Sequence, residues 1–272
     1  MKSKQSIPSS SGNKTGWSIN SGHSSTPPAV FQTIFCKAYT NARNFVFPPL
    51  CIVCSEPVAE TSRWFCSECL VKLEENNSGR DACPHCSQNL NVRSCTCDIV
   101  WDNPFERVFS LFDFDKVVQC IAHNIKYRGK SRLAFDIARV FACKIPSDFA
   151  ADADIIIPIP LHPFRKMKRG YNQAEFLARG FTHKRYNSHT LHTGLLTRTR
   201  HTKSQTRLDK EQRRTNLKGA FKVPAKKSDA LKNKNVILVD DVVTTGATTG
   251  YCAEVLLKAG AASVRVLSLA RD

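Results

Sequence analysis

Eight cysteines in four close pairs have the spacing of metal ligands. A C-x-x-C turn directs two thiolates at one point, and two such turns complete a tetrahedral zinc shell. Three pairs are C-x-x-C and the last is a tighter C-x-C: Cys51/Cys54, Cys66/Cys69, Cys83/Cys86 and Cys95/Cys97. The set predicts structural zinc, as one ion or two. Which pairs share an ion, sequential or interleaved ones, stays open.

Two other interpretations of these cysteines stand beside zinc. Disulfides are one, and a reducing compartment disfavours them. The other is redox chemistry at Cys83-Pro84-His85-Cys86, a form in which a helix start stabilises a thiolate, although the strand–helix–strand context of thioredoxin-like proteins is missing. The four lone cysteines are interpreted as small buried apolar residues: Cys36, Cys120, Cys143 and Cys252.

A second chemical signal lies in residues 236–248, VILVDDVVTTGAT. An apolar run leads to Asp240 and Asp241, a turn of small residues follows, and a helix is expected to begin there. Backbone N–H groups of such a turn, together with the helix dipole, bind anions. Gly246 allows close approach of a phosphate, and threonine hydroxyls add donors. Two carboxylates beside an anion site suit a ligand that carries a ribose, a phosphate and Mg²⁺.

Positioning these groups requires an α/β framework. The expected strands span 108–112, 154–158, 236–239 and 264–269, and the expected helices span 117–127, 133–145, 172–181 and 248–259. Strands that alternate with helices predict a mainly parallel sheet with helices on both faces. Ser131 is expected to cap the second helix, and Gly260 to end the last one.

Composition divides the chain into four parts. They are a polar tail over 1–28, expected to be disordered, a short helix and linker over 29–50, a zinc module over 51–100 and an α/β domain over 105–272. Few aliphatic residues separate the cysteine pairs, so the zinc module needs its metal for stability. Chelation is therefore expected to unfold residues 51–97 and to spare the α/β domain.

The net charge of +17 over 272 residues is concentrated in one segment. Residues 162–234 hold 20 lysines and arginines against 4 acidic residues, a net charge of +16. Such a field attracts phosphates, pyrophosphates or nucleic acid. No apolar stretch approaches the roughly 18 residues of a membrane span, and the N-terminus does not resemble a secretory signal. We expect a cytoplasmic protein.

Residues 236–248 resemble the phosphoribosyl-pyrophosphate (PRPP) motif of type I phosphoribosyltransferases. The resemblance is closer still to the ComF competence family, in which a double zinc ribbon precedes an amidophosphoribosyltransferase-like domain, and it spans about residues 45–272. Further matching segments are PIPLH at 158–162, RGYNQ at 169–173 and GAF at 219–221. The fold that this implies is a type I phosphoribosyltransferase fold behind a small cysteine-rich zinc module.

The resemblance also implies roles for site residues. A PRPP site with Mg²⁺ would be formed by Asp240, Asp241, Val242, Val243, Thr244, Thr245, Gly246, Ala247 and Thr248, with the two aspartates at the ribose hydroxyls. A pyrophosphate loop would include Arg165, Lys168, Arg169, Gly170 and Tyr171. The basic segment 198–216 would be a mobile active-site loop with Gln205, Arg213 and Asn216.

Three functions are compatible with the sequence. The first is a PRPP-dependent transferase or hydrolase of nucleotide metabolism, in which a nitrogen nucleophile displaces pyrophosphate; no residue is singled out as catalytic and no acceptor pocket is recognised. The second is a non-catalytic single-stranded DNA-binding protein of DNA uptake in natural transformation, using the zinc module and the basic segment. The third is an adaptor that binds a protein of the uptake machinery.

Overall fold

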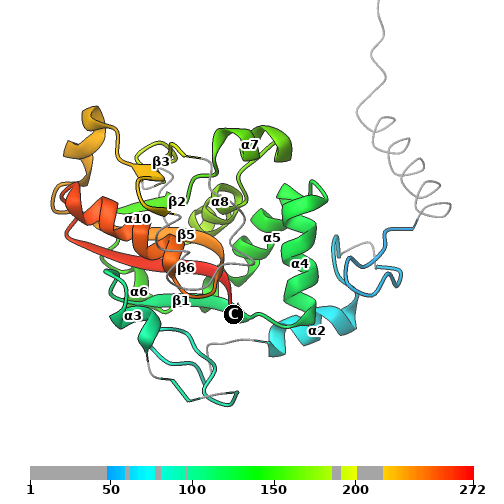
Figure 1. Cartoon of the computed structure of the whole chain (residues 1–272). Coiled ribbons are helices and arrows are strands. Elements are labelled where there is room, and N and C mark those ends of the chain that lie inside the picture. The colour runs from blue at the N-terminus through cyan, green and yellow to red at the C-terminus, as the bar shows by residue number, and fades with distance from the viewer. Residues whose placement is uncertain are drawn as a thin grey trace, which may run out of the picture. The chain divides into compact units, whose positions relative to one another are not determined.

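Four parallel strands form the centre of the structure, a computed structural model (Figure 1). They are β1 (Val108–Asp113), β2 (Ile155–Pro158), β5 (Asn235–Val243) and β6 (Ser263–Arg271), in the order β1-β6-β5-β2. Their residues are almost all buried, as expected for a parallel sheet covered on both faces. The prediction of a mainly parallel α/β sheet is confirmed.

The structure describes residues 48–58, 62–76, 81–92, 94–95, 97–185, 191–200 and 217–272. The predicted tail over 1–28, the helix expected after it, and Cys36 lie outside these ranges, as do Gln205, Arg213 and Asn216. Residues 49–272 form one compact unit. None of the helices in the described ranges is long and apolar enough to cross a bilayer.

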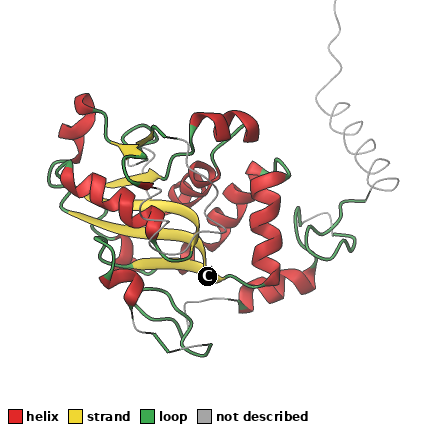
Figure 2. Ribbon diagram, viewed as in Figure 1, coloured by secondary structure: helices red, strands yellow, loops and turns green. Residues whose placement is uncertain are grey.

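Helices lie on both sides of the sheet (Figure 2). Alternation of side chains along the strands gives the sheet two apolar faces. On one face, Ile237 and Val239 pack with α4 (Lys116–Tyr127), α5 (Ser131–Phe141) and α8 (Gln173–Arg185). On the other face, Val236 and Leu238 pack with α10 (Ala247–Lys258). The sheet therefore lies between two apolar cores. The core with α4, α5 and α8 contains the buried Cys51 and Cys69, and the core with α10 contains the buried Cys83 and Cys86.

The ends of these helices are fixed by local chemistry. The Asp115 carboxylate accepts a hydrogen bond from the Val118 N–H at 2.8 Å and caps α4. Ser131 was predicted to cap α5, but it is the first helical residue, and Lys130 holds the cap position without a side-chain hydrogen bond. Gly260, just beyond α10, has a φ of 102°, which agrees with its predicted role.

Helix α7 (Pro163–Arg169) lies in a segment that the sequence analysis treated as loop. The His162 Nδ1 atom accepts a hydrogen bond from the Phe164 N–H, Pro163 occupies the first turn, and Gly170 ends the helix at a φ of 83°. No side chain of α7 is buried, so apolar periodicity could not reveal the helix, whereas the Pro and Gly at its two ends could have.

Smaller elements complete the described chain. They are the helices α2 (Ser67–Glu75), α3 (Asp98–Trp101), η1 (Ala142–Lys144), α6 (Ser147–Ala150) and η4 (Ala225–Leu231), and the antiparallel strands β3 (Thr197–Arg198) and β4 (Phe221–Lys222). The short helix α3 lies between the cysteine-rich part and β1 in the chain, and it packs against the start of α10.

Candidate metal clusters and phosphate site

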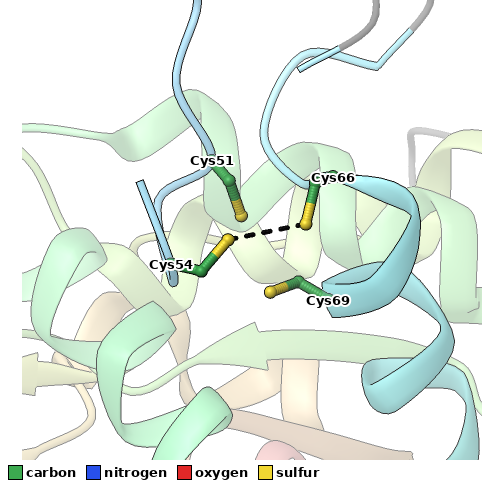
Figure 3. Close-up of side chains that lie close together, drawn as sticks. All are labelled: Cys51, Cys54, Cys66 and Cys69. Atoms are coloured by element: carbon green, nitrogen blue, oxygen red, sulfur yellow. Dashed lines mark hydrogen bonds between the residues drawn. The ribbon is translucent and has the colours of Figure 1, made fainter. Parts of the chain in front are cut away.

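The eight paired cysteines form two four-sulfur clusters. The first cluster is Cys51, Cys54, Cys66 and Cys69, and the second is Cys83, Cys86, Cys95 and Cys97; within each, the sulfur atoms all lie within 4.8 Å of one another. Figure 3 shows the four side chains of the first cluster pointing at one centre, with the Cys54 and Cys66 sulfurs 3.5 Å apart. The pairs therefore combine sequentially, and all eight cysteines are free thiols.

The thiols of each cluster cannot all ionise without a cation. Burial alone would raise the pKa of Cys51, but backbone N–H groups of the turn lower it to about 6. Burial and the neighbouring sulfurs raise the pKa of Cys69 far above its ordinary value. The second cluster repeats this division, with a pKa of about 7 for Cys83 and about 12 for Cys86, the latter raised by burial. A four-thiolate shell around a divalent ion fits this donor set, and zinc is the usual occupant.

The first cluster packs on the α4–α5 face of the sheet. The Trp64 indole N–H donates to the Asp136 carboxylate at 3.0 Å, and the Cys120 thiol donates to the Ile52 carbonyl at 3.0 Å. Cys120 is thus half-buried with a polar partner. Cys252 is buried as predicted, but Cys143 is exposed, so its predicted burial is wrong.

The second cluster packs on β1. The Val108 N–H donates to the His85 carbonyl at 2.7 Å, and the Ser87 hydroxyl donates to the Val108 carbonyl at 3.1 Å. Residues 83–86 form a turn and begin no helix, so the redox interpretation lacks the helix start that would stabilise a thiolate. The Cys86 and Cys95 sulfurs lie 3.0 Å apart, which ties this pair to the second cluster.

Residues 244–248, the threonine turn, connect β5 to α10. Gly246 occupies the cap position of α10 with a φ of 74°, and its carbonyl accepts a hydrogen bond from the Thr249 hydroxyl at 2.9 Å. A cavity of about 450 Å³ opens beside the turn. Its lining residues are Phe114, Lys126, Asp240, Val242, Val243, Thr244, Thr245, Gly246, Ala247, Thr248, Thr249 and Asp272. The first-turn N–H groups of α10 and the threonine turn give this cavity the donors of an anion site.

The two aspartates point to different sides because neighbouring residues of a strand alternate. Asp240 is part-exposed and lines the cavity, whereas Asp241 is buried and forms an ion pair with Lys126, with Nζ and Oδ2 2.7 Å apart. Burial, and then the charge of Asp241, raises the pKa of Asp240 to about 8. Burial alone would lower the pKa of Lys126, but the two carboxylates raise it.

Four residues that line this cavity were not predicted from the sequence: Phe114, Lys126, Thr249 and Asp272. Lys126 matters most, because it contacts Asp241. Lys126 lies at the end of α4. A single helix that connects two parallel strands would end near the amino ends of the strands, away from Asp241. Here two consecutive helices, α4 and α5, separate β1 from β2, so α4 can bring its last turn to Asp241. Phe114 could have been found, because it directly follows β1 and ligands gather at the carboxyl ends of parallel strands.

The residues expected at the pyrophosphate lie on and after α7, and two of them contact the last turn of α4. The Arg169 guanidinium donates to the Gln173 side chain at 2.5 Å and lies 5.6 Å from the centre of the Tyr127 ring. The Tyr171 hydroxyl donates to the Ile125 carbonyl. Among the described residues, the cavity lining includes none of Arg165, Lys168, Arg169, Gly170 and Tyr171.

Comparison with known proteins agrees with this architecture. Residues 133–272 match the phosphoribosyl transferase domain family. The chain is 30% identical to the DNA utilization protein YhgH of Salmonella typhi, over 82% of this chain and 97% of that protein. It is 27% identical to competence protein F of Haemophilus influenzae (81% and 96% covered) and 24% identical to competence protein ComFC of Bacillus subtilis (82% and 95%).

A solved structure of the allosteric regulatory enzyme of purine biosynthesis is also similar, with 17% identity and a TM-score of 0.31. The similarity covers 52% of this chain but only 26% of that one. The family match over residues 133–272 and the relative at 30% identity are the evidence for the family. This chain belongs to the ComF/YhgH family of competence and DNA-utilization proteins, with two four-cysteine clusters before a phosphoribosyltransferase domain.

Proposed function

We propose that this protein binds PRPP together with Mg²⁺ in the cavity at the end of β5. One observation supports this most directly: Asp240 and eight consecutive residues from Val242 to Thr249 line the same cavity, so a carboxylate and a row of anion-binding N–H groups face one space. The threonine turn would hold the 5′-phosphate, and Asp240 would hold ribose hydroxyls from the wall of the cavity. Asp241, which does not line the cavity, would act through Lys126, which does. Mg²⁺ would supply positive charge to the pyrophosphate.

Lys126 would take part in this site through Asp241. In the ligand-free chain its ammonium group neutralises the buried carboxylate at 2.7 Å. Because Lys126 also lines the cavity, its ammonium group would contact both Asp241 and a bound anionic ligand. Lys126 is thus proposed to add positive charge to the site when a polyanionic ligand binds.

Calorimetric titration of the full chain with PRPP, with and without Mg²⁺, tests this function. We expect micromolar, Mg²⁺-dependent binding that the double substitution Asp240→Asn and Asp241→Asn weakens by at least about tenfold, as for the loss of charged ligand contacts. Asp229→Asn is the matched control, since Asp229 is an exposed acidic residue that pairs with Lys232 and does not line the cavity. Unchanged PRPP affinity in the double variant would rule out the assigned site.

Transfer chemistry is a separate question from binding. A transferase would displace pyrophosphate from the anomeric carbon, with inversion, by a nitrogen nucleophile, and basic side chains would stabilise the departing pyrophosphate. Pyrophosphate release in the presence of ammonia and nitrogen-containing acceptors is the direct measurement. Binding without release would identify a protein that uses PRPP as a regulatory ligand.

A second candidate function, supported by a specific surface, is binding of single-stranded DNA. Tyr127, Phe164 and Met167 are 70%, 57% and 75% exposed, and Arg169 lies against the Tyr127 ring. Exposed aromatic rings among basic residues can stack on bases while the cations contact phosphates. The names of the relatives, DNA utilization protein and competence protein, support a role in DNA uptake, in which proteins of the uptake machinery are further candidate partners.

Fluorescence anisotropy with a labelled single-stranded oligonucleotide tests this surface. We expect affinity to fall steeply with salt and the double substitution Tyr127→Ala and Phe164→Ala to weaken binding by about tenfold or more, since stacking contributes about 1–3 kcal/mol per base. Val140→Ala is the control, an exposed apolar residue (55%) of α5, outside both the cysteine-rich part and the basic segment. Equal affinities of the two variants would exclude this surface.

A further inference from the structure

The second cysteine cluster continues directly into a segment that contacts the threonine turn. Its last ligand, Cys97, accepts a hydrogen bond through its carbonyl from the Val100 N–H at 2.8 Å, so α3 begins at the cluster. Ile99 in this helix is 7% exposed and lies in the same apolar core as Cys83 and Cys86. The metal ligands and Ile99 are therefore parts of one packed unit.

Two glycines allow this segment to lie against the threonine turn. A Cβ atom at Gly246 would lie 2.8 Å from Ile99 Cγ1 and 3.0 Å from Asn103 Nδ2. A Cβ atom at Gly250 would lie 1.9 Å from Asn103 Oδ1, closer than non-bonded atoms come. Ile99 and Asn103 thus lie directly on the backbone of the turn and of the first turn of α10.

Asn103 is itself held in place. Its side-chain amide donates to the Ile99 carbonyl at 2.7 Å, which links the two contact residues to each other. The N–H groups of the threonine turn can bind an anion only if the turn keeps its conformation. Ile99 and Asn103 contact the backbone of this turn, so they help to fix the conformation of the N–H groups proposed to hold the phosphate.

We propose that metal in the second cluster sets the affinity of the threonine turn for phosphate, with Ile99 and Asn103 as positioning residues that connect the two. This inference rests on the proposed function in assigning phosphate to the turn. The first cluster gives an internal comparison, because Cys51 and Cys69 lie in the core on the opposite face of the sheet, with α4 and α5. Since coupling between sites is reciprocal, a phosphoribosyl ligand must in turn raise the metal affinity of the second cluster.

The test uses the full zinc-loaded chain and hydrogen–deuterium exchange of the amides in residues 244–250, without any ligand. Cys95→Ser weakens the second cluster and Cys66→Ser weakens the first, each at a half-buried sulfur. We expect Cys95→Ser to speed exchange in residues 244–250 by about tenfold, within the range of 5–150-fold typical of coupled sites, and Cys66→Ser, which acts on the opposite core, to speed it clearly less. PRPP affinity should fall by about the same factor in Cys95→Ser and clearly less in Cys66→Ser.

Asn103→Ala tests the connection without touching a ligand of the metal. This variant is expected to keep two zinc ions, to speed exchange in residues 244–250, and to abolish the gain in zinc affinity that PRPP gives the second cluster in competition with a chromogenic chelator. Asn91→Ala is the matched control, because the exposed Asn91 side chain bonds to Asp81 within the same cysteine-rich part. Conservative Asn103→Gln, which keeps the amide, should recover part of the effect.

The outcomes separate the inference from the proposed function. Unchanged exchange in residues 244–250 in both Cys95→Ser and Asn103→Ala overturns the inference, even where PRPP binds well. Equal acceleration by Cys66→Ser also overturns it, because the effect would then be general destabilisation. Failure of the wild-type chain to bind PRPP overturns the proposed function, while the ligand-free exchange still decides whether the second cluster controls the turn.

Discussion

Asp240 is a carboxylate whose surroundings oppose its charge. Burial and the Asp241 carboxylate raise its pKa to about 8, against about 3.9 in an unfolded chain. Between these values the folded state binds the extra proton, so this residue makes the protein less stable as pH rises from about 4 to about 8. A ligand cation or ribose hydroxyl that favours the ionised form would relieve this cost, as expected for a binding site.

Asp240→Asn is therefore expected to stabilise the ligand-free protein. Because asparagine does not titrate, the gain in the free energy of unfolding should be larger at about pH 8.5 than at about pH 5, by about 1–4 kcal/mol. Urea unfolding of both proteins at the two pH values measures it, and titration of the cysteines cancels in the comparison. A gain of the same size at both pH values would mean that Asp240 does not titrate in this window.

The sequence indicated which residues of one continuous segment would lie together, but not that Lys126 from a distant helix would join them. Eight of the nine residues assigned to PRPP line the cavity, since a strand, a turn and a helix start that are continuous in sequence are placed together by backbone geometry alone. Lys126 enters from α4, and its contact with Asp241 depends on how two helices cross the sheet. Whether the predicted pyrophosphate residues bind their ligand stays a prediction.

At the scale of elements, the packing of α10 against the 99–103 segment makes an unusual demand on Gly250. Glycine within a helix costs about 1 kcal/mol relative to alanine, so Gly250→Ala would be stabilising on propensity alone. The new Cβ atom would however lie 1.9 Å from Asn103 Oδ1 and 3.1 Å from Asn103 Cβ. We expect Gly250→Ala to lower the free energy of unfolding by about 1–3 kcal/mol, the usual cost of overpacking.

A double-mutant cycle isolates this contact. In an Asn103→Ala background the clash with the amide oxygen is absent and only the 3.1 Å contact with the Cβ atom of residue 103 remains, so the same Gly250→Ala change should cost clearly less. Chemical denaturation of the four proteins gives the interaction energy. Additive effects of the two substitutions would show that Asn103 does not back the start of α10.

Element boundaries show which physical signals are readable in a sequence. β1, β2, β5 and β6 were predicted because buried parallel strands are continuous apolar runs, but β5 extends to Val243, beyond the apolar run that ends at Val239. The two aspartates are strand residues because β5 and β6 stay paired as far as Val243 and Arg271. Pairing of this kind is a tertiary property, which no window of the sequence contains.

At the scale of the whole molecule, the cysteine-rich part and the α/β domain share their cores. Cys51, Phe65 and Leu73 are buried with Phe112 and Ile125, and the second cluster is buried with Val108. Chelation was predicted to unfold residues 51–97 alone. That prediction rested on the few apolar residues within the segment, because a sequence does not show the contacts that these residues make outside it. Cores that cross a boundary favour a joint loss of structure instead.

Removal of zinc is therefore expected to act on the whole unit. With a strong chelator, the amides of residues 62–76 and of α5 should lose protection from hydrogen exchange at the same chelator concentration. The melting temperature should fall by more than about 10 °C, since a loss of about 4 kcal/mol has this effect in a domain of this size. The same chelator already saturated with zinc is the control. Loss of protection in residues 62–76 at a chelator concentration that leaves α5 protected would instead establish two independently folded modules, and would confine the influence of the clusters to the contacts of Ile99 and Asn103.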